Sequence, residues 1–471
     1  MKMKKKILSA AVLAALGAGS AQAVNLSTDG TGEVLVFPYF TVQGNEETLL
    51  SIVNTTNEGK VVKVRFREAY NTQEVLDFHV YLSPYDVWVA KIQDSADGGA
   101  EVYTPDNSCT TMDTNPQPFS DALFGDTGPT SADRKREGYF TAIEIARIVD
   151  MDLDNNGKQD YVHINGTPDN CNAIRQAWLN GTMAANSTVD QPTGGLMGTL
   201  AIINVQSGTE VSVPATVLEN FLDNPQHVAP GSLRPDWQDA FPRRSDVIVS
   251  DSAAGTVSIY SDAWGTGEDA VSAVLMASAV MNEYTVNPAT EASTAWVVTF
   301  PTKSLYVNGV SAVPPFTHTF AGDTDGDGKA CEEIGMTIFD REEGQLTPDG
   351  SLVSPPPEEE TLSLCYEANV IQFGDSSDVF SAANTEIRFN DSALPGTAGW
   401  AKMSFTAPAH TMTSVNGSVY TGLPVIGFKA TVLGNSNVGV GASYAAAVNH
   451  AYERDIVGTP AFTVGGNTSN P

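Results

Sequence analysis

The sequence predicts a mainly β protein built from immunoglobulin-like antiparallel β-sandwich domains, with long loop insertions and a few helices. The first observation is a series of β-branched and aromatic runs, separated by short Gly- and Asn-containing turns, that follow one another in about 60 residues. The second is that similar runs return in the second half of the chain. The runs of the first series are Glu33–Val42, Thr48–Thr56, Lys60–Asn71 and Glu74–Ile92.

The third run also predicts how its side chains lie. It alternates apolar and basic residues with a period of two, the pattern of a strand with one buried face and one wet face. The apolar positions are Val62, Val64 and Phe66, and the basic positions are Lys63, Arg65 and Arg67. We therefore expect the three basic side chains to face solvent.

Residues 95–190 differ in character, because Asp, Asn, Gly, Pro and Thr dominate them. Within this stretch only Tyr139–Val149 has the pattern of an ordered element, so we interpret the stretch as a long insertion. Strand signals resume at Met197–Val205.

Three segments carry helical signals. Pro214–Asp223 and Arg234–Phe241 are short candidates, and Glu268–Tyr284 is longer. The longer segment has acids in its first turn and apolar residues almost all round, which predicts a helix buried against a sheet.

The remaining strands are expected at Trp296–Asn308, Trp400–Ala407 and Leu423–Gly434. A second polar insertion, at about 314–365, follows the first of them.

The predicted organisation is a leader and two domains. An N-terminal sandwich covers 24–213 and carries the insertion at about 95–190. A second β-rich domain with helices covers 214–471 and carries the insertion at about 314–365.

Residues 1–23 have the pattern of a secretory signal peptide. Four lysines precede an apolar run, and Ala21-Gln22-Ala23 provides the small-x-small pattern of a cleavage site. The apolar run is short for a membrane span and no later stretch is long enough, so we expect no transmembrane segment. The predicted location is the cell surface or the extracellular space, with the periplasm as an alternative.

The chain is strongly acidic, with a formal net charge of −31 at pH 7. Such a charge disfavours binding to nucleic acid through its phosphates. It suits a soluble surface that collects divalent cations. The sequence contains no G-x-S-x-G, H-E-x-x-H or Walker loop, and its six histidines are scattered singly, which favours a non-enzymatic role.

The four cysteines favour disulfides, because their number is even and the chain carries an export signal. Of the three possible connectivities, Cys109 with Cys171 and Cys331 with Cys365 is the most economical, since each loop then encloses or flanks one acidic run. No C-x-x-C spacing supports the alternative of a zinc site.

Two acidic runs have the spacing of calcium-binding loops. A loop with acids at positions 1, 3 and 5, a Gly at 6 and a backbone carbonyl at 7 can wrap around one Ca²⁺ ion. The predicted ligands are Asp152, Asp154, Asn156, Lys158 (through its carbonyl) and Asp160 in the first loop, and Asp323, Asp325, Asp327, Lys329 (through its carbonyl) and Glu333 in and beside the second.

Both loops lack the acid at position 12, where His163 and Ile334 stand. We therefore expect an acid from elsewhere, such as Asp150 or Glu333, to complete the calcium shell. Without one, the affinity falls in the weak extracellular range of about 0.1–1 mM.

Two resemblances support an extracellular setting. The second loop with Cys331, Glu332 and Glu333 resembles the Excalibur-type extracellular calcium motif DxDxDGxxCE, in which the Cys is disulfide-bonded. The runs GTGEVLVFPYFTV, LLSIVNTT, VKVRFREAYN, LDFHVYLSPYDVW and WVVTFPTK are similar to a family of exported, surface-layer-like proteins of Gram-negative bacteria. That family implies a cell-surface structural role and provides no functional residues to transfer.

Three functions therefore stay open. The favoured one is a calcium-stabilised structural protein of the cell surface or extracellular matrix that self-associates. A binding module or adhesin for a glycan or another cell is the alternative, and a secreted hydrolase is the third. Association on adding calcium favours the first, retention on a glycan without association the second, and turnover the third.

Overall fold

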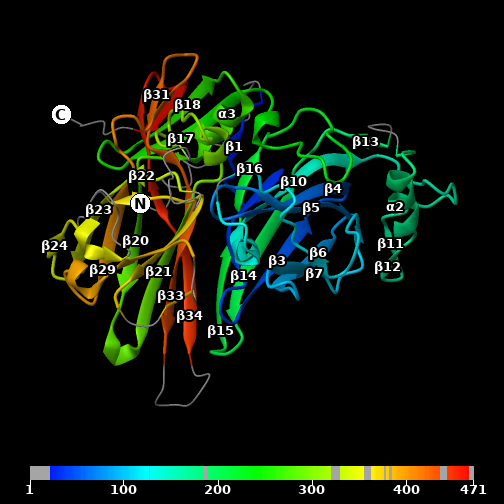
Figure 1. Cartoon of the computed structure of the whole chain (residues 1–471). Helices are drawn as coiled ribbons and strands as arrows, with labels where there is room; N and C mark the ends of the chain where they lie inside the picture. Colours follow the sequence, from blue (N-terminus) through cyan, green and yellow to red (C-terminus); the bar gives the residue numbers. More distant parts are fainter. Residues whose placement is uncertain are drawn as a thin grey trace.

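Antiparallel sheets form most of the regular secondary structure, which confirms the predicted fold class (Figure 1). The computed structural model describes residues 22–126, 128–183, 188–319, 329–348, 350–354, 362–375, 378–380, 384–434 and 443–465. The α-helices in these ranges are α2 (Cys171–Leu179) and α3 (Gly267–Leu275).

The N-terminal half forms a sandwich of two sheets. The first sheet is ordered β1 (Asn25–Leu26), β16 (Thr216–Glu219), β2 (Val34–Thr41), β10 (Glu137–Ile148), β4 (Gly59–Glu68), β5 (Glu74–Leu82) and β8 (Cys109–Thr110), with β13 (Val189–Asp190) beside β10. The second is ordered β15 (Thr209–Pro214), β14 (Leu196–Asn204), β3 (Glu46–Asn54), β6 (Val87–Asp94), β7 (Ala100–Tyr103) and β9 (Gln117–Pro118). Their apolar faces pack together around stacked Phe37 and Phe140, whose ring centroids lie 4.2 Å apart.

The C-terminal half contains a second pair of large sheets. One is ordered β25 (Val353–Ser354), β28 (Glu386–Phe389), β27 (Ala368–Phe373), β21 (Ala292–Thr299), β33 (Ile426–Leu433) and β34 (Tyr444–Asn449). The other is ordered β24 (Gln345–Leu346), β23 (Gly335–Asp340), β29 (Ala398–Ser404), β20 (Ala279–Thr285) and β35 (Ala451–Glu453). Trp296 lies between them, and its indole N–H donates to the Glu283 carbonyl across the two sheets.

Short sheets complete this half and the loops. They are β17 (Arg244–Asp251), β18 (Thr256–Ala263) and β37 (Phe462–Gly465); β30 (Thr411–Thr413), β31 (Val419–Thr421) and β36 (Asp455–Val457); β19 (Met276–Ala277) and β32 (Leu423–Pro424); β22 (Glu332–Glu333) and β26 (Ser363–Leu364); and β11 (His163–Ile164) and β12 (Thr167–Pro168).

The two sandwiches share one apolar core. Val297 and Phe428 of the second sandwich belong to the same buried cluster as Phe37 of the first. Polar contacts reinforce this packing: the Thr299 hydroxyl donates to the Pro38 carbonyl over 2.6 Å, and the Ala368 amide donates to the Ala69 carbonyl over 3.1 Å. The two halves therefore pack as one unit.

The first half differs in detail from the predicted division. The run Tyr139–Val149, which we placed inside an insertion, is strand β10 at the centre of the first sheet, paired with both β2 and β4. The run Pro214–Asp223, a helix candidate, contains strand β16, which pairs with β2 in the same sheet. The first sandwich therefore extends past the predicted boundary at residue 213.

The longer helix candidate is only half helical. Helix α3 begins after Thr266, whose side chain accepts from the Asp269 amide, and it ends at Leu275. The chain then continues as β19 and β20, because Ala279–Thr285 pairs with β29. Apolar residues all round a segment suit a buried strand as well as a buried helix, so the pattern could not separate the two. In Arg234–Phe241, the structure has a short 3₁₀ turn, Trp237–Asp239.

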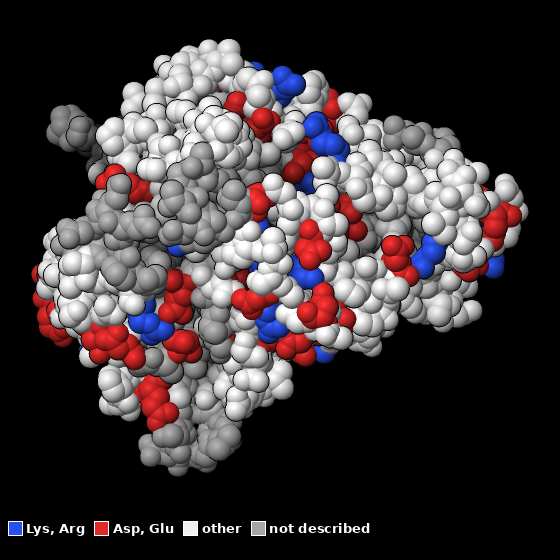
Figure 2. All heavy atoms as spheres, in the orientation of Figure 1, with Lys and Arg blue, Asp and Glu red and all other residues white. Residues whose placement is uncertain are grey.

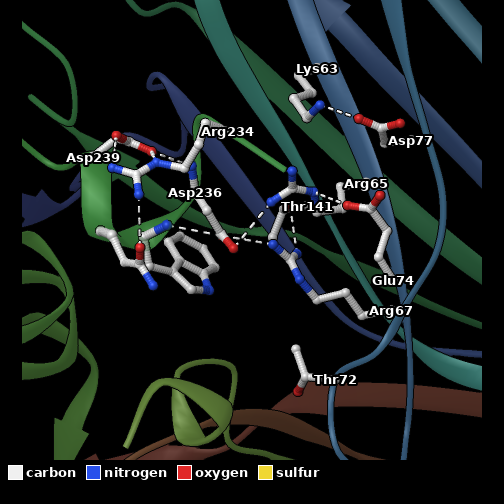
Figure 3. Close-up of polar contacts among 12 residues, drawn as sticks. Lys63, Arg65, Arg67, Thr72, Glu74, Asp77, Thr141, Arg234, Asp236 and Asp239 are labelled. Carbon is white, nitrogen blue, oxygen red and sulfur yellow. Dashed lines mark hydrogen bonds and ion pairs between the residues drawn. The ribbon is translucent and has the colours of Figure 1, made fainter. Parts of the chain in front are cut away.

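The predicted wet face of β4 is wrong. Lys63, Arg65 and Arg67 are each at most 3% exposed, because residues 226–239 cover this face of the sheet. Figure 3 shows the resulting network, in which Asp236 accepts from Arg67 over 2.7 Å and from Arg65 over 3.1 Å.

Carboxylates neutralise each of these buried cations. Lys63 pairs with Asp77, and Arg65 also pairs with Glu74 over 2.5 Å. Burial opposes ionisation of Asp236, but the charges of Arg67 and Arg65 outweigh it and lower the pKa of this carboxyl. Buried charges are tolerated only when they are paired in this way.

Candidate metal centre

The first acidic loop leaves the end of β10 and returns through the β11–β12 hairpin to the start of α2. It lies on the lobe that carries α2 at the right of Figure 1. The loop wraps around its own carboxylates: Asp152 accepts from the amides of Asn156 (2.9 Å) and Gly157 (2.8 Å). Gly157 has φ +84°, a left-handed conformation that favours glycine and explains its place at position 6 of the motif.

Three carboxylates converge at the centre of this loop. Asp154, Asp160 and Asp169 each offer an oxygen, and these atoms all lie within 4.8 Å of one another. Among the residues that the structure describes, it is the only group of at least three Asp, Glu, His or Cys side chains whose ligand atoms lie this close together. Oxygen ligands at this spacing suit a hard divalent cation such as Ca²⁺.

Asp160 is the buried member of the cluster. It is 0% exposed; its Oδ2 accepts from the Leu153 amide over 2.8 Å, whereas its Oδ1 is buried without a hydrogen-bond partner. Burial, followed by the negative charges of Asp154, Asp152 and Asp169, raises the pKa of Asp160 to about 6. A buried, unpaired carboxylate oxygen is costly, and a bound cation would remove that cost.

Asp169 completes the cluster and was missed in the sequence analysis. It stands nine residues beyond Asp160 and is brought back by the β11–β12 hairpin, where its amide donates to the Val162 carbonyl over 3.1 Å. Hydrogen bonds from Asn156 and Lys158 lower the pKa of Asp169. The only local signal was its position two residues before Cys171.

The other predicted members of the first loop lie around these carboxylates. The side-chain Nδ2 of Asn156 donates to Asp154 (3.2 Å) and to Asp169 (2.7 Å), and the Lys158 ammonium donates to Asp169 over 3.1 Å. An ammonium and an amide thus satisfy charges that a cation would otherwise neutralise. Asp150, suggested as an extra ligand, instead accepts from the Gln159 side chain over 2.8 Å.

His163, at position 12, points away from the carboxylates. Its Nδ1 lies 2.9 Å from the Ser83 hydroxyl and its Nε2 lies 2.9 Å from the Asn107 side-chain oxygen. It therefore joins the loop to the β5–β6 turn and to the segment before β8.

A disulfide and a helix hold the cluster in place. Cys109 and Cys171 are bonded, as predicted, and Asn170 beside them links the loop to α2. The Asn170 amide donates to the Asp160 carbonyl (2.8 Å), its Nδ2 donates to Asp154 (2.8 Å), and its Oδ1 caps α2 at Ala173.

Helix α2 in turn docks on the first sheet. Ile174 is buried, and the Trp178 indole N–H donates to the Tyr81 hydroxyl over 2.8 Å. Trp178 also packs against His227, which lies 6.0 Å from His79 between ring centroids. These two histidines come together from distant parts of the chain, and burial lowers the pKa of each, to about 4 for His227.

The second acidic loop is described only at its base. Asp323, Asp325 and Asp327 lie outside the described residues. Lys329 is exposed, and Glu333 is exposed in β22, opposite Ser363. The predicted bond between Cys331 and Cys365 is present.

Glu332, rather than Glu333, is the buried acid at this base. It accepts from the Thr317 hydroxyl (2.6 Å), the His318 amide (3.1 Å) and His410 Nε2 (3.1 Å). Burial opposes its ionisation, but the His410 contact, the charge of Lys303 and the Thr317 hydrogen bonds outweigh it and lower the pKa of Glu332 to about 2. Glu332 therefore holds the two ends of the second loop together.

Comparisons with known proteins add no relative to this description. No protein-family model, no curated protein and no solved structure matches the chain significantly. Among the described residues, no helix is both long and apolar enough to cross a membrane.

Proposed function

We propose that this protein is exported and serves as a calcium-stabilised structural component of the cell surface or the extracellular matrix. The observation that carries the proposal is the convergence of Asp154 and Asp169 on Asp160, whose buried Oδ1 has no hydrogen-bond partner. In this proposal one Ca²⁺ ion binds among the three carboxylates and fixes the first loop. Backbone carbonyls and water supply its remaining ligands.

The surroundings of the cluster support an extracellular, structural use of the ion. Two disulfides fit an oxidising compartment, and one of them ends two residues from Asp169. A weak site with an affinity of about 0.1–1 mM is useful only where calcium is in the millimolar range, as it is outside cells. The ion and the Cys109–Cys171 bridge then stabilise the same lobe.

The charge of the chain supports calcium-dependent association. Acidic side chains are spread over the face drawn in Figure 2, and the formal net charge is −31 at pH 7. Copies of such a protein repel one another at low salt, so close lateral packing needs screening or divalent bridging. Calcium can provide both the bridging and the loop order.

Light scattering of the purified mature chain during calcium titration tests this function. We expect the average mass to rise at millimolar calcium, and to rise less with magnesium at equal concentration. Asp154→Asn with Asp169→Asn should reduce the rise, whereas Asp150→Asn, in an exposed acid outside the cluster, should leave it unchanged. A protein that stays monomeric throughout the titration would contradict the structural role.

A further inference from the structure

The outer face of the second N-terminal sheet contains a groove that the calcium proposal does not use. One face of this sheet packs in the core, and the opposite face is open to solvent. On the open face lies a depression of about 460 Å³, formed by side chains of β3, β6, β7, β14 and β15. These strands lie in the N-terminal half in Figure 1. A volume of this size is within the range of small-ligand sites, roughly 300–1,000 Å³.

Strand register explains why this face is hollow. Across the sheet, Ser51 of β3 stands opposite Val89 of β6 and Thr199 of β14. In the neighbouring row, Ala201 of β14 stands opposite Ser212 of β15. Leu49 of β3 lies between Ala201 and Lys91 in that row and provides the apolar part of the floor, while the small side chains of Ser51 and Ala201 leave space beside it.

The sides of the groove combine an apolar surface with separate polar groups. Val89 and Tyr103 are each 37% exposed and offer an aliphatic surface and an aromatic ring. Lys91 and Glu210 line the same groove, together with the hydroxyls of the small residues. Lys91 also pairs with Glu47 over 3.1 Å. The groove therefore offers hydrogen-bond donors and acceptors around an apolar floor.

This combination selects among classes of ligand. A purely apolar ligand would displace water from the exposed Glu210 carboxylate and from the Lys91–Glu47 ion pair without replacing the lost hydrogen bonds, and an anionic ligand would be repelled by Glu47, Glu210 and the acidic chain. An extended peptide that adds a strand needs a sheet edge, whereas this groove lies on a face. A neutral sugar fits, because its C–H face packs on an aromatic ring and its hydroxyls can both donate to carboxylates and accept from an ammonium.

We propose that the groove binds a neutral hexose oligosaccharide, so that the first sandwich holds the protein on a neutral polysaccharide. The ring of Tyr103 packs on a sugar face, Glu210 accepts from sugar hydroxyls, and Lys91 donates to a sugar oxygen. No residue of the Asp154–Asp160–Asp169 cluster lines the groove. Sugar binding is therefore independent of the proposed calcium site.

Calorimetric titration of the mature protein with the hexasaccharides of β-1,4-glucan, β-1,3-glucan and α-1,6-mannan tests this proposal, with hexa-galacturonate as the anionic probe. We expect at least one neutral oligosaccharide to bind. Tyr103→Ala should weaken binding at least about fivefold, and Ala201→Leu, which fills the floor, should abolish it. Tyr444→Ala, in an exposed tyrosine of the second sandwich, should bind normally.

Melting curves show whether a variant that binds weakly is still folded. Tyr103 and Ala201 both face solvent, so their variants should melt with the wild type. Because Asp160→Asn leaves the groove untouched, it should bind the oligosaccharide normally, which separates this proposal from the calcium site. The proposal is overturned if none of the three neutral hexasaccharides binds at millimolar concentration, if only the galacturonate binds, or if the two groove variants bind as the wild type does.

Discussion

Replacing Asp160 by Asn should remove the calcium response of the first loop while sparing, or even raising, the stability of the protein without calcium. The substitution keeps the shape of the side chain and an oxygen for the Leu153 amide, and it removes one charge from the cluster. The new amide group would also stand where the Oδ1 lacks a partner, near two carboxylates to which it could donate.

The magnitude follows from the environment of this carboxyl. Its pKa is raised to about 6 in the ion-free fold, from an ordinary value of 3.8. The folded pKa lies above the unfolded one, so the charged carboxylate destabilises the ion-free fold above pH 6, and this effect disappears below about pH 4. At about 1.4 kcal/mol per pKa unit, the cost near neutral pH is up to about 3 kcal/mol.

At this site, calcium acts in the opposite direction, and only on the wild type. With a dissociation constant of about 0.1–1 mM, roughly 10 mM calcium stabilises the fold by about 1–3 kcal/mol. For a chain of this length, each kcal/mol moves the melting temperature by about 1 °C. We therefore expect the wild type to melt about 1–3 °C higher in calcium than in chelator.

Differential scanning calorimetry in calcium and in chelator measures both effects. Calcium should raise the melting temperature of Asp160→Asn less than that of the wild type, and in chelator Asp160→Asn should melt no lower than the wild type. Asp150→Asn, the same exchange in a neighbouring exposed acid, should respond as the wild type does. If Asp160→Asn keeps the full calcium response, Asp160 is not a ligand and the reasoning fails.

Three further predictions concern the loop, its disulfide and the buried acids. Lys158→Met should increase the calcium affinity severalfold in calorimetric titration, because the Lys158 ammonium competes with the ion for Asp169; an unchanged or lower affinity would contradict this competition. Replacing Cys109 and Cys171 by Ser should cost up to about 4 kcal/mol of stability and weaken calcium binding to the first loop, whereas Cys331→Ser with Cys365→Ser should leave that affinity unchanged. At saturating calcium, the buried acids and the buried histidines should have opposite effects on the pH dependence of stability. Burial raises the pKa of Glu33 and Glu137 from 4.5 to about 7, so their contribution to stability is lost between about pH 4.5 and 7 and stays constant above pH 7; burial lowers the pKa of His227 and His450 from 6.5 to about 4, so their contribution is lost as the pH falls from 6.5 to 4. Glu33→Gln should therefore gain stability relative to the wild type as the pH rises from about 4.5 to 7, and the difference should stay constant above pH 7. Urea unfolding of both proteins from pH 4 to 9 measures this difference; a difference that does not change between pH 4.5 and 7 would refute the assignment.

The sequence predicted the sandwich because strand patterning is local. Period-two alternation in β4 placed Val62, Val64 and Phe66 in the core correctly. It failed for Arg67 on the opposite face, because the partner that permits burial of this cation, Asp236, lies 169 residues away. No local pattern reports a pairing of that kind.

The candidate site was also predicted only in part from the sequence. Spacing within nine residues predicted Asp154 and Asp160, which lie in the carboxylate cluster, and the Gly157 turn. Asp152, predicted in the same way, lies outside the cluster and accepts from the backbone amides of Asn156 and Gly157. Asp169 could not be found by spacing, because it lies beyond the calcium-loop motif and the β11–β12 hairpin returns it to the cluster. The choice of disulfide partners was correct because linking neighbouring cysteines places each bridge beside an acidic loop.

The most direct test of the central claim is X-ray diffraction from crystals grown in calcium, with anomalous data collected to locate the ion. We predict a calcium peak at about 2.4 Å from oxygens of Asp154, Asp160 and Asp169, with the Lys158 ammonium displaced from Asp169. A density map at millimolar calcium with no ion among these carboxylates, and with Lys158 still paired to Asp169, would contradict it.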